Sequence, residues 1–268
     1  MQKLSIITFL SLSFFSFSQT QEAELEKRKR HDELQQKFVT DCAEHYNYNY
    51  NMNEWQACLD AGLKVDSTYA YFWQQKAMPY FKARKYEVGM NYIDKAVLYD
   101  AERWQPYRAF IKCIFAKTYK DAILDFEDCI KKFGNGYVMD HTYNFYIAIS
   151  CLQLNEFSKV EILLQDYVNQ MLAKNGEDWL HPTALFYLGI SQYEQSRFEE
   201  AITNFDKALK NYKNLAEAQY YKAICLAKLG KTEEYQTLLK EAFENAKIGY
   251  KLSEDNTIYE TYPYQPRW

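Results

Sequence analysis

The chain has 268 residues and a formal net charge of −4 at pH 7, with 32 basic and 36 acidic side chains. Glycine and proline are scarce, at eight and five residues, while Lys, Glu, Ala, Leu and Tyr are abundant, which favours a helical class. No basic stretch stands without nearby carboxylates, so the sequence gives no reason to expect nucleic-acid binding.

The first residues have the pattern of a secretory signal peptide. Lys3 supplies a positive start, an apolar stretch runs from Leu4 to Phe17, and the small residues Ser16 and Ser18 precede Gln19. This stretch is too short to span a bilayer, and the alternative of an uncleaved anchor is therefore disfavoured. We expect cleavage near Ser18 to remove residues 1–18. The mature protein should then be periplasmic or extracellular, without a transmembrane segment.

Residues 19–30 form a charged lead-in. The basic run Lys27 to Arg30 is surrounded by Glu22, Glu24, Glu26, Asp32 and Glu33. Mixed charges of this kind are typical of a solvated helix face rather than of a binding patch.

From residue 31 to residue 250 the sequence repeats one pattern of large and small residues. One clear copy has, at offsets of 0, 4, 7, 16, 20 and 23, the residues Trp73, Ala77, Tyr80, Gly89, Ile93 and Ala96. Another has, at offsets of 0, 3, 4, 16, 20 and 23, the residues Leu185, Leu188, Gly189, Ala201, Phe205 and Ala208. The copy from Tyr220 to Ala242 follows in register at 34 residues, and weaker copies lie elsewhere.

This pattern resembles that of the tetratricopeptide-repeat family. The resemblance implies an all-α fold, a right-handed superhelical solenoid of about six helical hairpins, whose helices approach closely at Gly and Ala. The hairpins are expected at residues 31–66, 70–100, 103–134, 141–175, 182–214 and 216–250. The first is the most degenerate, which is typical of a terminal repeat.

Two departures from the family pattern predict local irregularity. Phe110 and Ile111 stand where the third hairpin should have small residues, which should push its helices apart. The fourth hairpin has about seven extra residues near Met171 to Asp178 relative to the repeat length. Its second helix is therefore expected to be longer, and Asn175-Gly176 is a suitable end for it.

The sequence contains no motif that carries catalytic chemistry. The four histidines, His31, His45, His141 and His181, include no close helical pair that could share a metal ion. Gly134-Asn135-Gly136 lacks the Lys and hydroxyl residues of a phosphate-binding loop and is interpreted as a turn. We therefore expect no catalytic residues, no cofactor and no metal, and a protein that is not an enzyme.

The six cysteines suggest one disulfide. Cys42 and Cys58 fall on the two helices of the first hairpin at positions that should roughly face each other, and export permits oxidation. This pair is the candidate disulfide, with buried free thiols as the alternative. No CxxC motif occurs, and buried thiols are the interpretation of the other four residues, Cys113, Cys129, Cys151 and Cys225.

The family's inner positions predict an aromatic-rich concave groove, made mainly by the first helix of each hairpin. It would be lined by Tyr71, Gln74, Met78, Phe81, Lys82, Phe145, Ile149, Phe186, Ile190, Tyr193 and Tyr220. Such patches mark contact surfaces, although each of these residues can equally pack between hairpins. The groove predicts a non-catalytic scaffold of the cell envelope that binds a protein or peptide partner. A glycan- or small-ligand-binding protein is the alternative function, since aromatic walls also stack sugar rings.

Residues 251–268 depart from the helical period. They combine Pro263 and Pro266, which prevent a regular helix, with the aromatic residues Tyr259, Tyr262, Tyr264 and Trp268. A disordered tail is rarely so aromatic. We expect this segment to fold back onto the last hairpins or into the groove, the alternative being an exposed epitope for another envelope protein.

Overall fold

The computed structural model describes residues 21–268, and the predicted signal peptide lies outside the described residues. The chain forms two compact units, one ending at Tyr99 (unit 1) and one from Asp100 to Trp268 (unit 2). Within the described part, no helix is long and apolar enough to span a bilayer.

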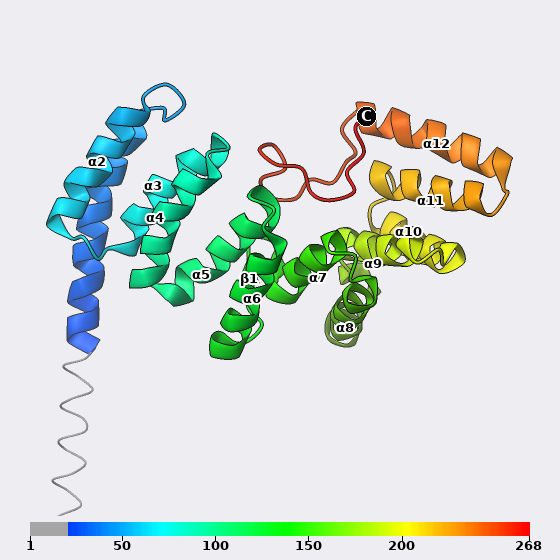
Figure 1. Cartoon of the computed structure of the whole chain (residues 1–268), viewed down its shortest axis with the longest axis horizontal. Helices are drawn as coiled ribbons and strands as arrows, with labels where there is room; N and C mark the ends of the chain where they lie inside the picture. Colours follow the sequence, from blue (N-terminus) through cyan, green and yellow to red (C-terminus); the bar gives the residue numbers. More distant parts are fainter. Residues whose placement is uncertain (1–20) are drawn as a thin grey trace, which may run out of the picture. The chain divides into compact units, whose positions relative to one another are not determined.

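Unit 1 is built of helices joined by short turns (Figure 1). Its described elements are helical residues 21–35, the π-helical turn η1 (Gln36–Thr40), the 3-10 turn η2 (Ala43–His45), α2 (Met52–Val65), α3 (Ala70–Lys82) and α4 (Tyr86–Tyr99). Two glycines let the helices approach. A Cβ on Gly62 would lie 2.7 Å from a ring carbon of Phe72, and a Cβ on Gly89 would lie 2.4 Å from one of Phe81. Phe72 and Phe81 are both buried, so each glycine makes room for a core ring.

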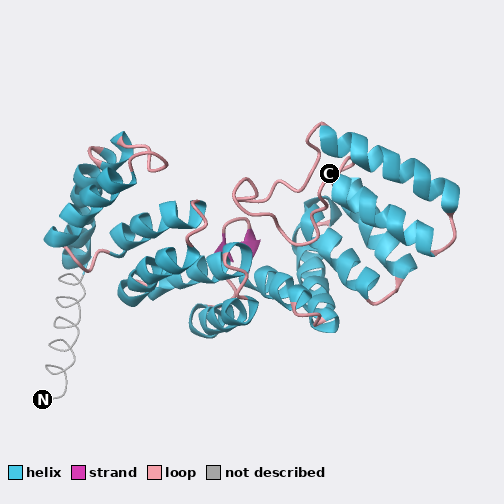
Figure 2. Cartoon of the chain, turned by 45° about the horizontal axis from the view of Figure 1, so that its top comes forward, coloured by secondary structure: helices cyan, strands magenta, loops and turns pink. Residues whose placement is uncertain are grey.

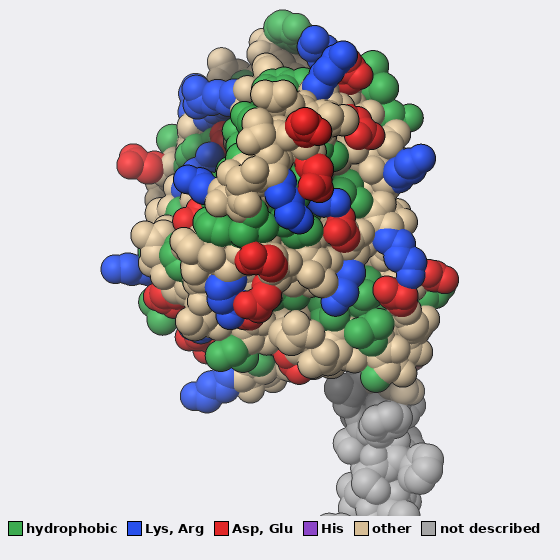
Figure 3. Space-filling view, turned by 90° about the vertical axis from the view of Figure 1, so that its right-hand side faces the viewer, with side chains coloured by type: hydrophobic (Ala, Val, Ile, Leu, Met, Phe, Trp, Pro, Cys, Tyr) green, Lys and Arg blue, Asp and Glu red, His purple; other side chains and the backbone are tan. Residues whose placement is uncertain are grey.

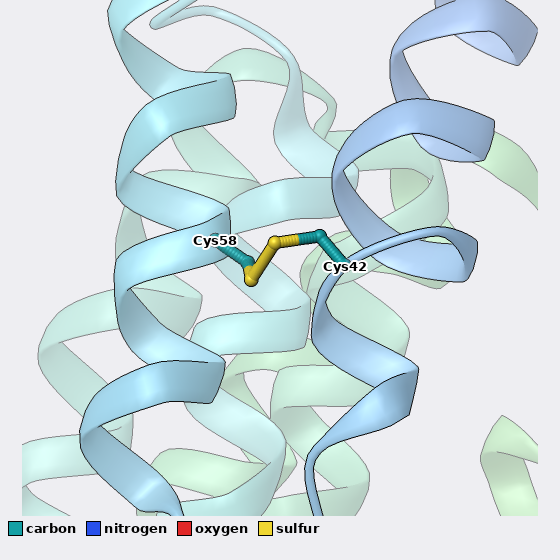
Figure 4. Close-up of a disulfide and its surroundings, with 2 residues drawn as sticks. All are labelled: Cys42 and Cys58. Atoms are coloured by element: carbon teal, nitrogen blue, oxygen red, sulfur yellow. A yellow bond between two sulfur atoms is a disulfide. The ribbon is translucent and has the colours of Figure 1, made fainter.

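Cys42 and Cys58 form a disulfide in unit 1 (Figure 4). Cys58 lies on α2 and Cys42 lies between η1 and η2, with Cα atoms 5.8 Å apart. The bond joins the first helical segment of the unit to α2, beside the core residues Leu59 and Trp55.

Unit 2 contains the remaining hairpins (Figure 2). Its elements are α5 (Ala101–Phe110), η3 (Ile111–Phe115), α6 (Tyr119–Phe133), β1 (Tyr137–Val138), β2 (His141–Thr142), α7 (Tyr143–Gln153), α8 (Phe157–Asn175), η4 (Glu177–Trp179), α9 (Pro182–Glu194), α10 (Phe198–Asn211), α11 (Ala216–Lys228) and α12 (Thr232–Lys247). Helices adjacent in sequence pack on one another as hairpins. The prediction of an all-α fold of repeated helical hairpins is confirmed.

Small residues lie where the paired helices of unit 2 meet. A Cβ on Gly189 in α9 would lie 2.6 Å from a ring carbon of Phe205 in α10. Ala201 and Ala208 in α10, and Ala223 in α11, are fully buried. Close approach of helices at small side chains, with large rings filling the flanks, is what the repeat pattern specifies.

The two predicted irregularities correspond to local changes of helix geometry. Helix α5 continues into the π-helical segment η3, which begins at Ile111 directly after Phe110, and both residues are buried. A π segment adds a residue to a turn and so re-aims the bulky side chains. In the fourth hairpin, α8 runs for 19 residues to Asn175 and is followed by Gly176 with φ of 87°.

One short element was not anticipated from the sequence. Between α6 and α7 the chain forms a two-stranded antiparallel pair in which Tyr137 lies opposite Thr142 and Val138 opposite His141. The turn that joins the strands places Met139 at φ of 51°. The strand pair sets His141 and Thr142 in buried positions directly before α7.

Candidate binding face

The predicted groove residues of unit 1 divide into core and half-buried positions. Gln74 and Phe81 are buried, whereas Tyr71, Met78 and Lys82 are half-buried. Lys82 Nζ donates a 3.0 Å hydrogen bond to Tyr48 Oη, which ties α3 to the loop before α2. In unit 1 the predicted surface therefore contacts the chain's own loop at Lys82.

The predicted groove residues of unit 2 are covered more completely. Tyr193 and Tyr220 are half-buried, and the other four are fully buried: Phe145, Ile149, Phe186 and Ile190. These four therefore contribute to the core of unit 2 rather than to an open surface. The side chains that do contact the covering segment lie beside them, on the first helices α7, α9 and α11 of the last three hairpins; we call this surface the first-helix face.

The C-terminal tail, residues 251–268, covers the first-helix face without forming a helix or strand. It runs out from the end of α12 and then returns toward it (Figures 1 and 2). On the outward limb, the Leu252 amide donates a 3.0 Å hydrogen bond to Glu217 Oε2 near the start of α11. Glu254 then reaches the start of α9, where it accepts a hydrogen bond from Thr183 Oγ1.

Between the outward limb and the returning limb of the tail, Glu260 forms a 3.4 Å ion pair with Lys117, which lies just after η3. The returning limb then buries Tyr262 beside Tyr146 of α7. Burial, together with neighbouring Tyr262, raises the pKa of Tyr146 well above its usual value of 10. Burial likewise raises the pKa of Tyr262, so both phenols are neutral at neutral pH.

The returning limb is held by hydrogen bonds and by aromatic contacts. Tyr187 Oη donates to the Pro263 carbonyl oxygen at 2.9 Å, and Tyr264 Oη donates to Glu194 Oε1 at 2.8 Å. The Tyr264 ring also lies 5.8 Å from that of Tyr221, in an edge-on arrangement. The last residue of the tail contacts two rings edge-on, as shown by centroid distances of 5.7 Å from Trp268 to Tyr220 and 5.5 Å from Trp268 to Phe243.

Two histidines and a carboxylate converge where the outward limb crosses α7 and α9. His141 Nε2 lies 2.7 Å from Glu254 Oε2, and the His141 and His181 rings are 4.7 Å apart. His141 and Glu254 are buried, at 2% and 6% exposed. The ligand atoms of all three side chains lie within 4.8 Å of one another.

The electrostatics of this cluster follow from burial and from its internal contacts. Burial, reinforced by His141, lowers the pKa of His181 below 6.5. Burial alone would raise the pKa of Glu254, but hydrogen bonds from His141 and Thr183 more than offset it and the net pKa lies below 4.5. Glu254 is thus an anion at neutral pH and His181 a neutral imidazole.

The sequence did not reveal this cluster because Glu254 is 113 residues from His141. A weaker signal was available: His181 stands immediately before α9 and His141 stands two residues before α7, and these are the first helices of consecutive hairpins. In a repeat array, corresponding parts of consecutive hairpins lie side by side. The absence of a close helical pair therefore does not keep these two imidazoles apart.

The four free thiols are not nucleophiles in this structure. Burial raises the pKa to about 12 in each of them: Cys113, Cys129, Cys151 and Cys225. A thiol of that pKa carries a negligible fraction of thiolate at neutral pH. They pack as small apolar groups inside the hairpins.

The outer surface near α11 and α12 carries charges of both signs. Figure 3 shows Lys and Arg side chains interspersed with Asp and Glu side chains on this face, with apolar groups between them. On α11 and α10, Lys222 Nζ and Asp206 Oδ1 form an ion pair at 2.5 Å. Neither sign of charge gathers into one patch on the face that Figure 3 shows.

Comparisons with known proteins agree with this architecture. The family model for the tetratricopeptide repeat matches residues 182–215, which hold α9 and α10. No curated protein sequence matches the chain.

Among solved structures, PilW, described as a widely conserved type IV pilus biogenesis factor, has 16% identity and a TM-score of 0.59, over 81% of this chain and 94% of its own. MamA from Desulfovibrio magneticus RS-1 has 10% identity and a TM-score of 0.55, over 67% and 96%. YrrB, described as a TPR protein with an unusual peptide-binding site, has 16% identity and a TM-score of 0.50, over 71% and 93%. Residues 182–215 are thus a tetratricopeptide repeat, and the chain has the fold of tetratricopeptide-repeat proteins.

Proposed function

We propose that this chain is a non-catalytic scaffold of the cell envelope that binds an extended segment of another protein along the first-helix face of unit 2. The observation that carries the proposal is the tail itself. An irregular segment of 18 residues, 251–268, lies across α7, α9 and α11 with both main-chain and side-chain contacts. The tail therefore serves as an example, within one chain, of the kind of ligand that the face accepts.

The contacts of the tail are those of peptide recognition. Main-chain groups are bound by side chains of the face, as in the hydrogen bond from Tyr187 to the Pro263 carbonyl and that from the Leu252 amide to Glu217. Aromatic anchors at Tyr264 and Trp268 supply apolar contact area, and aromatic anchors dominate the energy of many interfaces. Because the helices of the face pack on their neighbours in the array, we expect capture to cost less entropy than it would on a flexible surface.

The structural relatives and the N-terminus support the same role. YrrB has a peptide-binding site and PilW is a type IV pilus biogenesis factor, both on a related fold at low identity. For this chain, a location in the cell envelope follows from the expected signal peptide at residues 1–18. A scaffold there would meet extended segments of other exported proteins.

A partner that uses the first-helix face must compete with the tail. Only molecules with an undocked tail can bind the partner. The apparent affinity for the partner is therefore the intrinsic affinity multiplied by the fraction of molecules in which the tail is undocked. The returning limb is the part that such a partner would replace, because its contacts are mainly aromatic rings and single hydrogen bonds.

The test uses a protein of residues 19–251 and a fluorescent peptide with the sequence of residues 252–268. We expect saturable binding of the peptide to the shortened protein by fluorescence anisotropy. Binding to the protein of residues 19–268 should be far weaker, because its own tail competes at a high effective concentration. Circular dichroism reports that the shortened protein is folded.

Matched variants locate the binding on the first-helix face. Tyr187→Phe in the shortened protein removes the donor to the Pro263 carbonyl and should weaken peptide binding about five- to tenfold, since a hydrogen bond contributes about 1 kcal/mol. Tyr50→Phe is the control, because Tyr50 is 85% exposed in unit 1. A folded shortened protein that does not bind the peptide, or whose Tyr187→Phe variant binds it equally well, would contradict the proposal.

Export is tested separately. Expression of the full chain with its own N-terminus in a bacterial host, followed by fractionation and mass measurement, should give a mature protein beginning at Gln19. A protein retained in the cytoplasm with residues 1–18 intact would contradict the proposed location in the cell envelope. It would not contradict peptide binding by the first-helix face.

A further inference from the structure

The cluster of His141, His181 and Glu254 has the composition of a metal site. Two imidazole nitrogens and one carboxylate oxygen are a common set of three protein ligands for Zn²⁺, whose remaining position a water molecule fills. Hard cations such as Ca²⁺ and Mg²⁺ prefer sites made of oxygen ligands alone. The donor set therefore selects a borderline transition metal.

The geometry allows one ion to reach all three side chains. Their ligand atoms lie within 4.8 Å of one another, and His141 Nε2 is 2.7 Å from Glu254 Oε2. A tetrahedral Zn²⁺ bound at about 2.0–2.1 Å needs ligand atoms about 3.4 Å apart. An ion at this place would therefore separate His141 Nε2 from Glu254 Oε2 and draw the more distant ligand atoms together.

The polar groups around the cluster are those that a metal site requires. His181 Nδ1 is buried and has no hydrogen-bond partner, so a ligand there would satisfy it. Thr183 Oγ1 donates a hydrogen bond to Glu254 Oε1, the oxygen that does not face His141, and so orients the carboxylate. The His141 ring is stacked on Phe145, with a centroid distance of 3.7 Å, which fixes its plane.

We propose that His141, His181 and Glu254 bind one Zn²⁺ ion and that this ion fastens the C-terminal tail to unit 2. The three ligands come from three segments: the strand before α7, the residue before α9 and the outward limb of the tail. Binding of the ion favours the docked tail by mass action, because the undocked state lacks the Glu254 ligand. The site is independent of the proposed peptide binding and would exist even if no partner used the first-helix face.

The test is a Zn²⁺ titration of the untagged protein of residues 19–268 after treatment with a chelator. Competition with a chromophoric chelator should give one tightly bound ion per chain. Co²⁺ as a spectroscopic probe should give the intense visible bands of a four-coordinate site. Since loss of a residue that merely supports a metal ligand typically costs about 10- to 100-fold, loss of a ligand in His181→Gln or Glu254→Gln should weaken Zn²⁺ binding at least about a hundredfold.

Two variants separate loss of the ligand from loss of the fold. His181→Gln is the more informative, because His181 Nδ1 has no hydrogen bond to lose. His45→Gln is the matched control, since His45 is exposed and lies in unit 1. No tight Zn²⁺ binding, or tight binding that His181→Gln leaves unchanged, would overturn the site.

Fastening of the tail is measured by hydrogen exchange. Zn²⁺ should slow exchange of amides in residues 252–262 of the wild-type protein and leave them unchanged in His181→Gln. Tight binding of Zn²⁺ without any change in exchange of the tail would overturn the fastening role.

Discussion

Tyr187 of α9 donates a 2.9 Å hydrogen bond to the carbonyl oxygen of Pro263, across 76 residues of sequence. Tyr187 is fully buried, and burial raises the pKa of its phenol well above 10, so the hydroxyl remains a donor at all ordinary pH values. Proline itself has no amide hydrogen, and its carbonyl is therefore the main-chain group by which this point of the tail can be held.

Removal of this hydroxyl should destabilise the protein modestly. Tyr187→Phe keeps the ring in place and leaves the Pro263 carbonyl without its donor, which costs about 1 kcal/mol. For a unit of this size, about 1 kcal/mol corresponds to a fall in Tm of about 2–4 °C. Differential scanning calorimetry of the protein of residues 19–268 measures it, with Tyr50→Phe as the control. Equal Tm values for wild type and Tyr187→Phe would show that the contact contributes nothing in solution.

The disulfide between Cys42 and Cys58 should contribute more. It closes a loop with a sequence separation of 16 residues. Loop-closure entropy predicts about 3 kcal/mol of stabilisation for a loop of this length. Urea unfolding with and without reductant should show this loss for the wild-type protein. The double variant Cys42→Ala with Cys58→Ala should be less stable from the start and insensitive to reductant. A wild-type midpoint that reductant does not move would mean that the bond is absent in the purified protein.

The fold could be predicted from the sequence because it depends on local rules that recur. Gly189 and Phe205 stand 16 residues apart, and Ala77 and Ile93 take the corresponding places in an earlier hairpin. Each such set of small and large residues specifies one helix crossing, so the repeat spacing alone predicts the number and order of the hairpins. The greater length of α8 was predicted in the same way, because the fourth hairpin has extra residues relative to the repeat length.

The tail and its contacts could not be predicted at this level of detail. Glu254 meets His141 and Thr183 only after the chain has turned back across α9 and α11, and residues 251–268 have no period from which to read a register. The aromatic content predicted that the tail would fold back onto the last hairpins or into the groove, but it did not predict which residues the tail contacts. The groove residues show the same limit, because Phe145 and Phe186 occupy inner positions of the pattern and yet lie in the core.

Gly189 offers a direct test of the helix crossing. In Gly189→Ala, the new Cβ would lie 2.6 Å from a ring carbon of Phe205, a distance that requires the ring or the helix to shift. Such overpacking typically costs about 1–3 kcal/mol. Urea unfolding of Gly189→Ala, of Phe205→Leu and of the double variant completes a thermodynamic cycle. Because the smaller leucine side chain leaves room for the new Cβ, the double variant should be destabilised less than the sum of the single variants. If the two single destabilisations simply add in the double variant, the new Cβ of Gly189→Ala does not act through Phe205.

Glu161 of α8 should give the protein a measurable dependence on acid. Burial raises the pKa of this carboxyl, but hydrogen bonds from Arg197, Gln192 and Gln195 more than offset the effect and the net pKa lies below 4.5. For an acid whose pKa is lowered by folding, the stabilisation is complete above the unfolded pKa and is lost as the pH falls through the folded pKa.

Glu161→Gln should therefore lower the free energy of unfolding by about 1 kcal/mol at pH 7. The effect is modest because the ion pair of Glu161 with Arg197 is partly exposed. The difference from wild type should shrink below about pH 4.5. Urea unfolding at several pH values between 3 and 7 measures it, with the exposed Glu244→Gln as the control. A stability difference that stays constant down to pH 3 would show that the ionised carboxylate of Glu161 is not what stabilises the contact of α8 with the end of α9 and the turn that follows it.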